Sequence, residues 1–240
     1  MPDQRTFVLL HGAFHGGWCW VRVADILRAA GHRVTTPTQT GLGERKHLMS
    51  KDITLETFVL DLVNHIESED LSDVVLVGHS FGGMAITGAA DRIPQRLRHL
   101  VYLDARVLEP GQTPLDVSIP KVREERIRTA QEFSGGLCVP PPKAESFGVP
   151  AGPDADWVDQ HLTPHPMGTF TSTLALAHAI GNGLPCTYIA CTEPLSEQLA
   201  SSRVWARARP DWGWREIATG HDAMVSAPQE LAGMLIEIAG

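Results

Sequence analysis

The sequence predicts an α/β fold, in which a mostly parallel sheet of about six strands carries helices on both faces. Short apolar runs rich in β-branched residues, at residues 7–10, 74–77 and 97–103, are typical of strands buried on both faces. Segments with apolar residues at three-to-four spacing separate these runs, so strand and helix alternate. In such sheets ligands bind at the carboxyl ends of the strands.

The N-terminal part is predicted to contain four of the strands and the helices between them. A helix over 18–30 has an apolar face and a capping glycine, Gly31. A short strand over 32–36 follows, and Thr54 can cap the next helix. The run 74–77 is followed by a helix that Pro94 closes, and the fourth strand, 97–103, ends at Asp104.

The C-terminal part begins with a change in proline content and in hydrophobic pattern. Residues 109–166 contain ten prolines and little strand pattern, and a long irregular insertion in a compact domain is usually functional. We therefore expect one domain, 1–240, in which residues 109–180 form an inserted cap. Helices are predicted over residues 121–133, 156–162, 171–180, 196–209 and 229–238, and strands over residues 187–191 and 214–217.

Composition excludes several classes of protein. The chain has 240 residues and a net charge of -8, so it has no basic excess for a nucleic-acid partner. No apolar segment approaches membrane-span length, and the N-terminus has no signal-peptide pattern, so we expect a cytoplasmic protein without a membrane partner. Four cysteines without metal-binding spacing are expected to be reduced thiols. Neither a metal nor a cofactor is expected.

The sequence Gly78-His79-Ser80-Phe81-Gly82 follows a predicted buried strand and precedes a predicted helix. The pattern Gly-x-Ser-x-Gly between these elements is the nucleophile elbow, which holds a serine on a strained turn with its hydroxyl exposed. Ser80 is therefore the candidate nucleophile.

A serine hydroxyl needs a base, and the oxyanion formed on a substrate needs preorganised donors. His221 follows the last predicted strand, in the chain order that this chemistry uses. The N–H groups of Phe81, after the nucleophile, and of Ala13, in the glycine-rich loop after the first strand, are the expected oxyanion donors.

Two residues compete for the acid that orients His221. Asp104 directly follows the strand after the elbow, and Glu193 lies in the loop after the penultimate strand, where Pro194 follows it. We favour Asp104, because it needs the shorter reach, and keep Glu193 as the alternative. Asp222 is expected to be a turn residue.

Four residues are expected to contact the substrate. Gly12, Phe14 and His15 belong to the oxyanion loop, and Trp157 belongs to the insertion. Glycines and aromatic side chains at the end of a strand are well suited to line a small-molecule pocket.

The sequence resembles the α/β-hydrolase superfamily, in residues 11–20, 78–84 and 220–222. More closely, it is similar to small bacterial esterases and to the plant methyl-ester esterase and hydroxynitrile lyase group. The run Thr40-Gly41-Leu42-Gly43-Glu44-Arg45 resembles a bacterial subgroup that includes carbendazim-hydrolysing esterases. The resemblance implies the α/β-hydrolase fold, with Ser80 as nucleophile, His221 as base and, as in related proteins, a homodimer.

Two departures bear on function. The aspartate that this group has after the penultimate strand is missing, and Gly12 and Asp222 replace the threonine and lysine of the lyases. The second departure favours hydrolysis. We therefore expect a serine hydrolase that cleaves a small, apolar or aromatic carboxylic ester through an acyl-enzyme. The alternatives are a carbamate or amide hydrolase with the same triad, a hydroxynitrile lyase, and a non-catalytic small-molecule receptor.

Overall fold

A six-stranded sheet forms the centre of the computed structural model, which describes residues 4–240. The strand order is β2-β1-β3-β4-β7-β8, and every neighbouring pair is parallel. The predicted α/β fold is therefore confirmed. The strands of this sheet are β1 (Thr6–Leu10), β2 (Arg33–Thr35), β3 (Val74–His79), β4 (Leu97–Leu103), β7 (Cys186–Cys191) and β8 (Trp212–Ile217).

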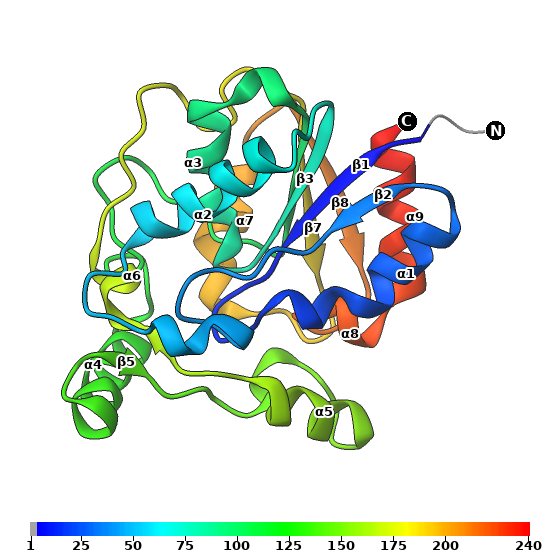
Figure 1. Ribbon diagram of the computed structural model, residues 1–240. Helices are drawn as coiled ribbons and strands as arrows, with labels where there is room; N and C mark the ends of the chain where they lie inside the picture. Colours follow the sequence, from blue (N-terminus) through cyan, green and yellow to red (C-terminus); the bar gives the residue numbers. More distant parts are fainter. Residues whose placement is uncertain (1–3) are drawn as a thin grey trace.

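Helices cover both faces of this sheet (Figure 1). One core cluster joins the sheet to α1, α8 and α9, and the other joins it to α2, α3 and α7. These helices are α1 (Val21–Ala29), α2 (Leu55–Ser68), α3 (Gly82–Arg92), α7 (Ala200–Arg207), α8 (Ala223–Ser226) and α9 (Pro228–Ala239). Short 3₁₀ helices are η1 (Gly17–Trp20), η2 (Gly43–Leu48), η3 (Pro94–Arg96), η4 (Ala144–Phe147) and η5 (Glu197–Leu199).

The strand sequences fill both cores by simple alternation. In β1, Phe7 and Leu9 face α1 and α9, whereas Val8 and Leu10 face the opposite cluster. All four side chains are at most 1% exposed. Because both faces need apolar side chains, a central parallel strand is apolar throughout, which is why these runs were recognisable in the sequence.

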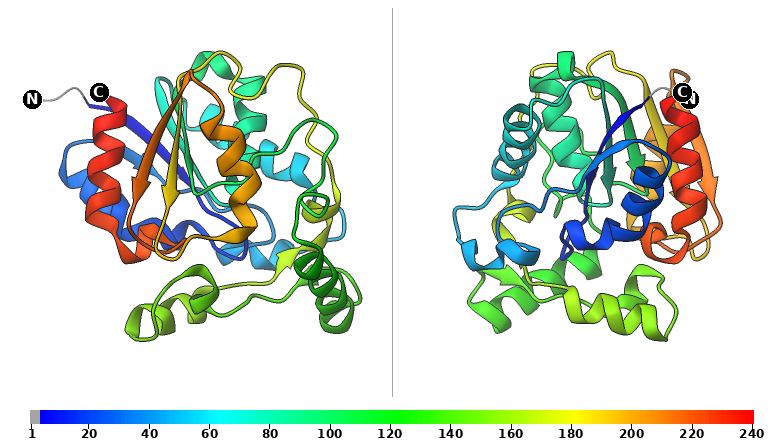
Figure 2. Two further views of the ribbon diagram at one scale, coloured as in Figure 1. Left: turned by 180° about the vertical axis from the view of Figure 1, so that it is seen from behind. Right: turned by 45° about the vertical axis from the view of Figure 1, so that its right-hand side comes forward.

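The chain between β4 and β7 leaves the sheet at its carboxyl edge. It contains α4 (Pro120–Ser134), α5 (Pro153–His161), α6 (Met167–Thr171) and the antiparallel pair β5 (Cys138–Val139) and β6 (His165–Pro166). Figures 1 and 2 show α4, β5 and α5 as a layer below the ends of the strands. We refer to this segment, residues 109–180, as the cap.

The prediction of a helix over residues 171–180 is wrong. Only α6 is helical, and residues 173–176 have no regular structure. The carboxylate of Asp91 accepts hydrogen bonds from the backbone N–H groups of Ala177 and His178, at 3.0 and 2.8 Å. This side chain thus satisfies polar groups that a helix would satisfy internally.

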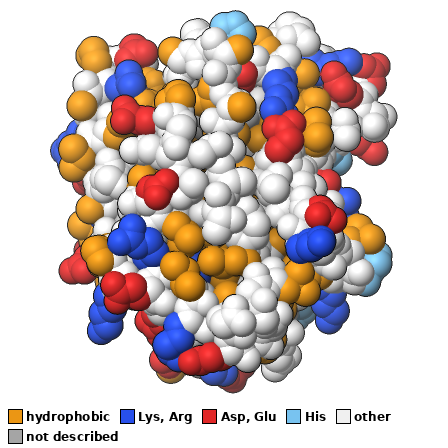
Figure 3. Space-filling model, turned by 90° about the vertical axis from the view of Figure 1, so that its left-hand side faces the viewer, with side chains coloured by type: hydrophobic (Ala, Val, Ile, Leu, Met, Phe, Trp, Pro, Cys, Tyr) orange, Lys and Arg blue, Asp and Glu red, His pale blue; other side chains and the backbone are white. Residues whose placement is uncertain are grey.

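The predicted helix over 18–30 is divided into η1 and α1, and the other predicted helices agree within a few residues. In the described part of the chain, no helix is long and apolar enough to cross a membrane. On the face seen in Figure 3, acidic and basic side chains are interspersed, so this face has no extended patch of one charge.

Candidate active site

Ser80 occupies a sharp turn between β3 and α3. Its φ angle of +52° lies in the left-handed region, which is rare for a residue with a side chain. A Cβ atom on Gly78 would lie 2.9 Å from the Gly82 carbonyl oxygen, and one on Gly82 would lie 2.7 Å from the His11 oxygen. Both glycines are therefore required by space, and the turn has the geometry expected of a nucleophile elbow.

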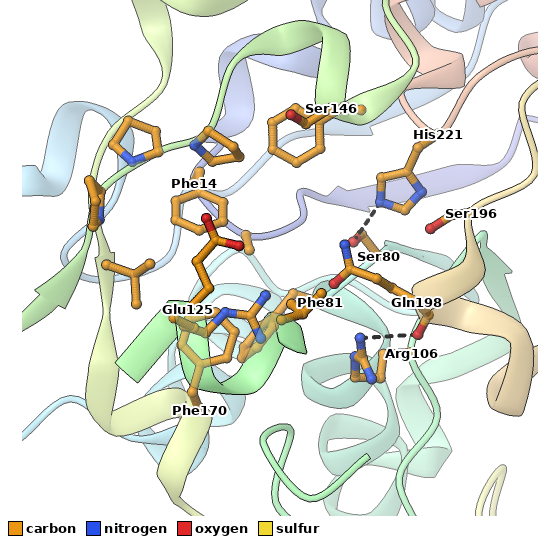
Figure 4. Close-up of a pocket in the computed structure, with 18 of the residues that line it drawn as sticks. Phe14, Ser80, Phe81, Arg106, Glu125, Ser146, Phe170, Ser196, Gln198 and His221 are labelled. Atoms are coloured by element: carbon orange, nitrogen blue, oxygen red, sulfur yellow. Dashed lines mark hydrogen bonds between the residues drawn. The ribbon is translucent and has the colours of Figure 1, made fainter. Parts of the chain in front are cut away.

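A chain of hydrogen bonds connects Ser80, His221 and Asp104. His221 Nε2 is 2.8 Å from Ser80 Oγ, and His221 Nδ1 is 2.6 Å from Asp104 Oδ2 (Figure 4 draws the first of these bonds). Because the carboxylate can only accept, Nδ1 carries the proton and Nε2 is free to accept from the Ser80 hydroxyl. This is the arrangement in which a histidine can act as base toward a serine.

The structure brings Asp104, and not Glu193, to His221. Asp104 is fully buried, whereas Glu193 is exposed and its side chain forms no hydrogen bond or ion pair within residues 4–240. The guanidinium of Arg203, from α7, lies 3.4 Å from Asp104 Oδ1 and also donates to the Ser196 carbonyl. Arg203 was not predicted, because nothing in the sequence around a helical arginine indicates which carboxylate it meets.

The loop after β1 lies against the elbow. A Cβ atom on Gly12 would lie 2.8 Å from the Cβ of Ser80, so a glycine is needed for this approach. Within residues 4–240, neither the Ala13 N–H nor the Phe81 N–H donates to another backbone group outside regular elements. Phe14, at a φ of +68°, donates its own N–H to His165 Nδ1 at 3.2 Å. The N–H groups of Ala13 and Phe81 therefore remain available as donors next to Ser80.

His15 and Asp222 form a buried pair behind this loop. His15 Nε2 is 3.0 Å from Asp222 Oδ2, and His15 Nδ1 is 2.7 Å from the Ala13 carbonyl oxygen. Both partners accept, so both ring nitrogens need a proton, and the ring is an imidazolium facing a carboxylate. Burial alone would lower the pKa of His15, but the charge and hydrogen bond of Asp222 raise it above its ordinary value.

This pair corrects two predictions. Asp222 is a fully buried ion-pair partner and not a turn residue, and burial, which alone would raise its pKa, is outweighed by the charge of His15, which lowers it. His15 does not line the cavity that opens onto Ser80, because its ring packs on Trp18 and Phe147 and bonds to Asp222. It positions the carbonyl of Ala13 instead.

His79, next to Ser80, supports the loop that carries His221. Its Nε2 is 3.0 Å from the His221 carbonyl oxygen, and its Nδ1 has no partner in the described residues. One acceptor and no second partner indicate a neutral ring, and burial indeed lowers the pKa of His79 well below its ordinary value. His79 is therefore neutral whereas His15 is charged, because His15 faces two acceptors and His79 faces one.

A cavity of about 420 Å³ opens onto the Ser80 hydroxyl and His221. Figure 4 shows Phe14, Phe81 and Phe170 along it, with Gln198 beside Ser80. Its lining residues are Ala13, Phe14, Ser80, Phe81, Arg106, Val122, Glu125, Arg126, Thr129, Val139, Pro140, Pro141, Pro142, Ser146, Phe147, Phe170, Ser196, Gln198, Leu199 and His221. Eleven of these twenty residues are apolar, and among them are four phenylalanines and three prolines. The charged members of the wall had not been singled out in the sequence.

Two further predicted contacts lie outside this wall. Trp157, on α5, packs its ring 5.1 Å from that of Trp18, and the guanidinium of Arg22 lies 5.3 Å from its ring centre. Gly12 packs against Ser80 behind the cavity surface. Of the four predicted contacts, the structure therefore places only Phe14 in the wall.

Residues 40–45 stabilise the position of the oxyanion loop, which follows β1. Arg45 donates to the Thr38 carbonyl and to the Thr40 hydroxyl, both at 2.8 Å, and its guanidinium lies 3.4 Å from Asp61. Thr38 in turn accepts from the Gly17 N–H, at 2.8 Å. The motif therefore has a structural role, which is to fix the chain that follows β2 against the loop beside Ser80.

Neither metal ligands nor disulfides are found in the described residues. No group of three or more His, Cys, Asp or Glu side chains is placed to hold a metal ion there, and all four cysteines are free and buried. Burial raises the pKa of Cys186 to about 12 and the pKa values of Cys19 and Cys191 well above the ordinary range. Cys19, Cys186 and Cys191 are therefore poor nucleophiles, because the thiolate is the reactive form.

Comparison with known proteins extends this description. A model of the alpha/beta hydrolase family matches residues 7–234. The chain is 43% identical to a carbendazim hydrolyzing esterase of Nocardioides sp. (strain SG-4G), over 97% of this chain and 98% of that protein. It is 27% identical to methylesterase 7 of Arabidopsis thaliana, over 99% and 97%. An extracellular alpha/beta-hydrolase from a Paenibacillus species has a TM-score of 0.86 at 23% identity, covering 98% of both chains, which is a likeness of fold.

Proposed function

The chain belongs to the alpha/beta hydrolase family and is an enzyme of the esterase type, and we propose that it cleaves a small, apolar or aromatic carboxylic ester through an acyl-enzyme on Ser80. The observation that carries this proposal is the unbroken series of hydrogen bonds from Ser80 Oγ through His221 to the buried Asp104, next to the cavity. A lone histidine or serine would not support it.

The reaction follows from this geometry. Ser80 Oγ attacks the carbonyl carbon of the ester while its proton passes to His221 Nε2, and Asp104 stabilises the imidazolium. The oxyanion accepts hydrogen bonds from the N–H groups of Ala13 and Phe81. The tetrahedral intermediate collapses, the C–O bond to the alcohol breaks, and His221 returns the proton to the leaving oxygen. Water then repeats the sequence on the acyl-Ser80 bond and releases the acid.

The cavity supports a substrate of modest size. Its volume of about 420 Å³ is near the lower end of small-molecule sites. Phe14, Phe81, Phe147 and Phe170 give it four aromatic rings, which favour an aromatic or apolar group beside the scissile bond.

A carbamate is the second candidate substrate class. The observation that favours it is the 43% identity to a protein named for hydrolysing carbendazim. The same residues would act, because a carbamate has a carbonyl carbon that a serine can attack. An ester and a carbamate of p-nitrophenol, with the matching p-nitroanilide as the amide, would rank the classes by kcat/KM.

The decisive experiment is a burst-phase assay with p-nitrophenyl esters of increasing acyl length. We expect a burst of p-nitrophenol close to one equivalent from the wild type when deacylation is the slower step, and none from Ser80→Ala. Mass spectrometry of the quenched wild type should find the acyl group on Ser80. Turnover that survives in Ser80→Ala would overturn the proposal. Cyanide release from mandelonitrile without ester turnover would favour the lyase, and tight binding without product would favour the receptor.

A further inference from the structure

Arg106 lies in the cavity wall without a full set of partners. It follows Asp104 by two residues and is only 7% exposed. One guanidinium nitrogen, Nη2, donates to the Gln198 carbonyl at 3.3 Å, whereas Nη1 is buried without a hydrogen-bond partner in the described residues. Figure 4 shows Arg106 on the same side of the cavity as Gln198. An unsatisfied buried donor on a charged group is costly unless a ligand fills it.

Arg126 adds a second guanidinium to the same wall, from the cap helix α4. It is half-buried, its Cζ lies 4.2 Å from the ring centre of Phe170, and its Nη1 donates to Ser118 Oγ at 3.3 Å. Neither Arg106 nor Arg126 forms an ion pair with any carboxylate of residues 4–240. By contrast, Arg203, the buried arginine behind the site, has Asp104 as its counter-ion.

Both cavity arginines remain charged at neutral pH. Burial lowers the pKa of Arg106 to about 10, and burial together with the charge of Arg106 lowers the pKa of Arg126 to about 10. The two cations therefore feel each other across a partly desolvated space. A bound anion would relieve both the repulsion and the missing hydrogen bond.

We propose that Arg106 and Arg126 bind a carboxylate on the substrate, so that the preferred ester carries a free carboxylate beyond the group next to its scissile bond. A guanidinium matches a carboxylate in geometry, and the unpartnered Nη1 of Arg106 supplies a ready donor. Glu125 also lines the cavity but is exposed, and Figure 4 shows it across from Arg106. This inference rests on the proposed esterase function.

Six methyl benzoates test the inference. Each carries one ring substituent, which is a carboxylate, a carboxamide or a methyl group, in the para or the meta position. Para and meta isomers are both used, so that one ring geometry does not decide the result. We expect kcat/KM for the carboxylate member of one isomer to exceed that for its carboxamide about tenfold or more, a ratio typical of one hydrogen bond to a charged group. This ratio should fall toward one in Arg106→Gln and in Arg126→Gln.

The matched control is Arg128→Gln, which removes one charge from the same helix. Arg128 is exposed, pairs with Glu132 at 2.7 Å and does not line the cavity, so the ratio should persist. Because Arg126 is half-buried on the cap, its variant keeps the test valid if Arg106→Gln fails to fold. A carboxylate member no better than the carboxamide, or a ratio unchanged in both cavity variants, would overturn the inference.

Binding to Ser80→Ala separates the two proposals. The esterase proposal fails when the wild type hydrolyses none of the esters, whereas the inference fails when it hydrolyses them without preference. By calorimetry, Ser80→Ala should bind the carboxylate ester about tenfold more tightly than the carboxamide. Equal Kd values would contradict a carboxylate site irrespective of turnover.

Discussion

Replacing Asp222 by asparagine removes the charge from the buried pair behind the oxyanion loop with little change in shape. In the wild type, the His15 ring donates to Asp222 at 3.0 Å and to the Ala13 carbonyl at 2.7 Å, and both side chains are at most 1% exposed. In Asp222→Asn, the new amide can donate to a neutral Nε2 while Nδ1–H still donates to Ala13. The hydrogen bonds survive, but the attraction between two charges is lost.

The loss of unfolding free energy in Asp222→Asn should decrease as pH rises. At 3.0 Å and an effective dielectric constant of about 20, the attraction is roughly 5 kcal/mol, and desolvation offsets much of it. We expect Asp222→Asn to lose about 3 kcal/mol of unfolding free energy at pH 5.5. The pKa of His15 is raised in the folded protein, so its contribution is complete below the unfolded histidine pKa and is lost as pH rises through the folded value. The lowered pKa of Asp222 has no effect in this range.

Urea unfolding at intervals from pH 5.5 to pH 9 measures this difference. The gap between wild type and Asp222→Asn should narrow with pH, by about 1.4 kcal/mol for each unit that separates the folded and unfolded pKa values of His15. The control, Asp154→Asn, breaks an exposed pair with Arg22 and should cost at most about 1 kcal/mol at every pH. A gap that stays constant with pH, or a variant as stable as wild type at pH 5.5, would refute the imidazolium assignment.

Three further predictions concern the candidate site and the thiols. Asp104→Asn should lower kcat with p-nitrophenyl esters about 10³- to 10⁴-fold, because it removes the carboxylate that bonds to His221. Glu193→Gln should lower kcat less than about threefold, because Glu193 is exposed. The reverse order of the two effects would identify Glu193 as the acid. Gly12→Ala should lower kcat/KM at least about tenfold, because its Cβ would lie 2.8 Å from that of Ser80, and wild-type activity would contradict this close packing. Cys186 and the other three thiols should react with a disulfide reagent only on unfolding, and fast labelling of the native enzyme would show that they are accessible.

The sheet and the elbow could be predicted because their signals are local. A strand buried on both faces needs an unbroken apolar run, and the elbow needs glycine at positions 78 and 82 for reasons of space. The position of His221 followed from chain order, because parallel strands bring their carboxyl ends to one edge of a sheet. Each of these rules refers to residues that are neighbours in the sequence or in the strand pattern.

The remaining features depend on contacts between distant segments. The pair of His15 and Asp222 joins residues 207 positions apart, and no local pattern marks either as charged and buried. The two cavity arginines lie on different segments, one after β4 and one on α4, and only the folded cap brings them together. The failed helix over 171–180 has the same origin, since Asp91 of α3 provides the competing acceptor.

The choice of acid follows from the register of the central strands. His79 of β3 pairs with Leu103 of β4, so Ser80 and Asp104 leave the sheet side by side, both with positive φ angles, of +52° and +36°. The Ser80 N–H donates to the Leu103 carbonyl at 3.0 Å, which ties the two turns together. His221 then needs to reach only one place to meet both side chains. Because Asp104 already contacts His221 at this position, the segment after β7 does not have to provide an acid. Three residues of that segment line the cavity instead, namely Ser196, Gln198 and Leu199. The segment after β7, which contains the alternative acid Glu193, therefore contributes to the cavity wall and not to the contact with His221.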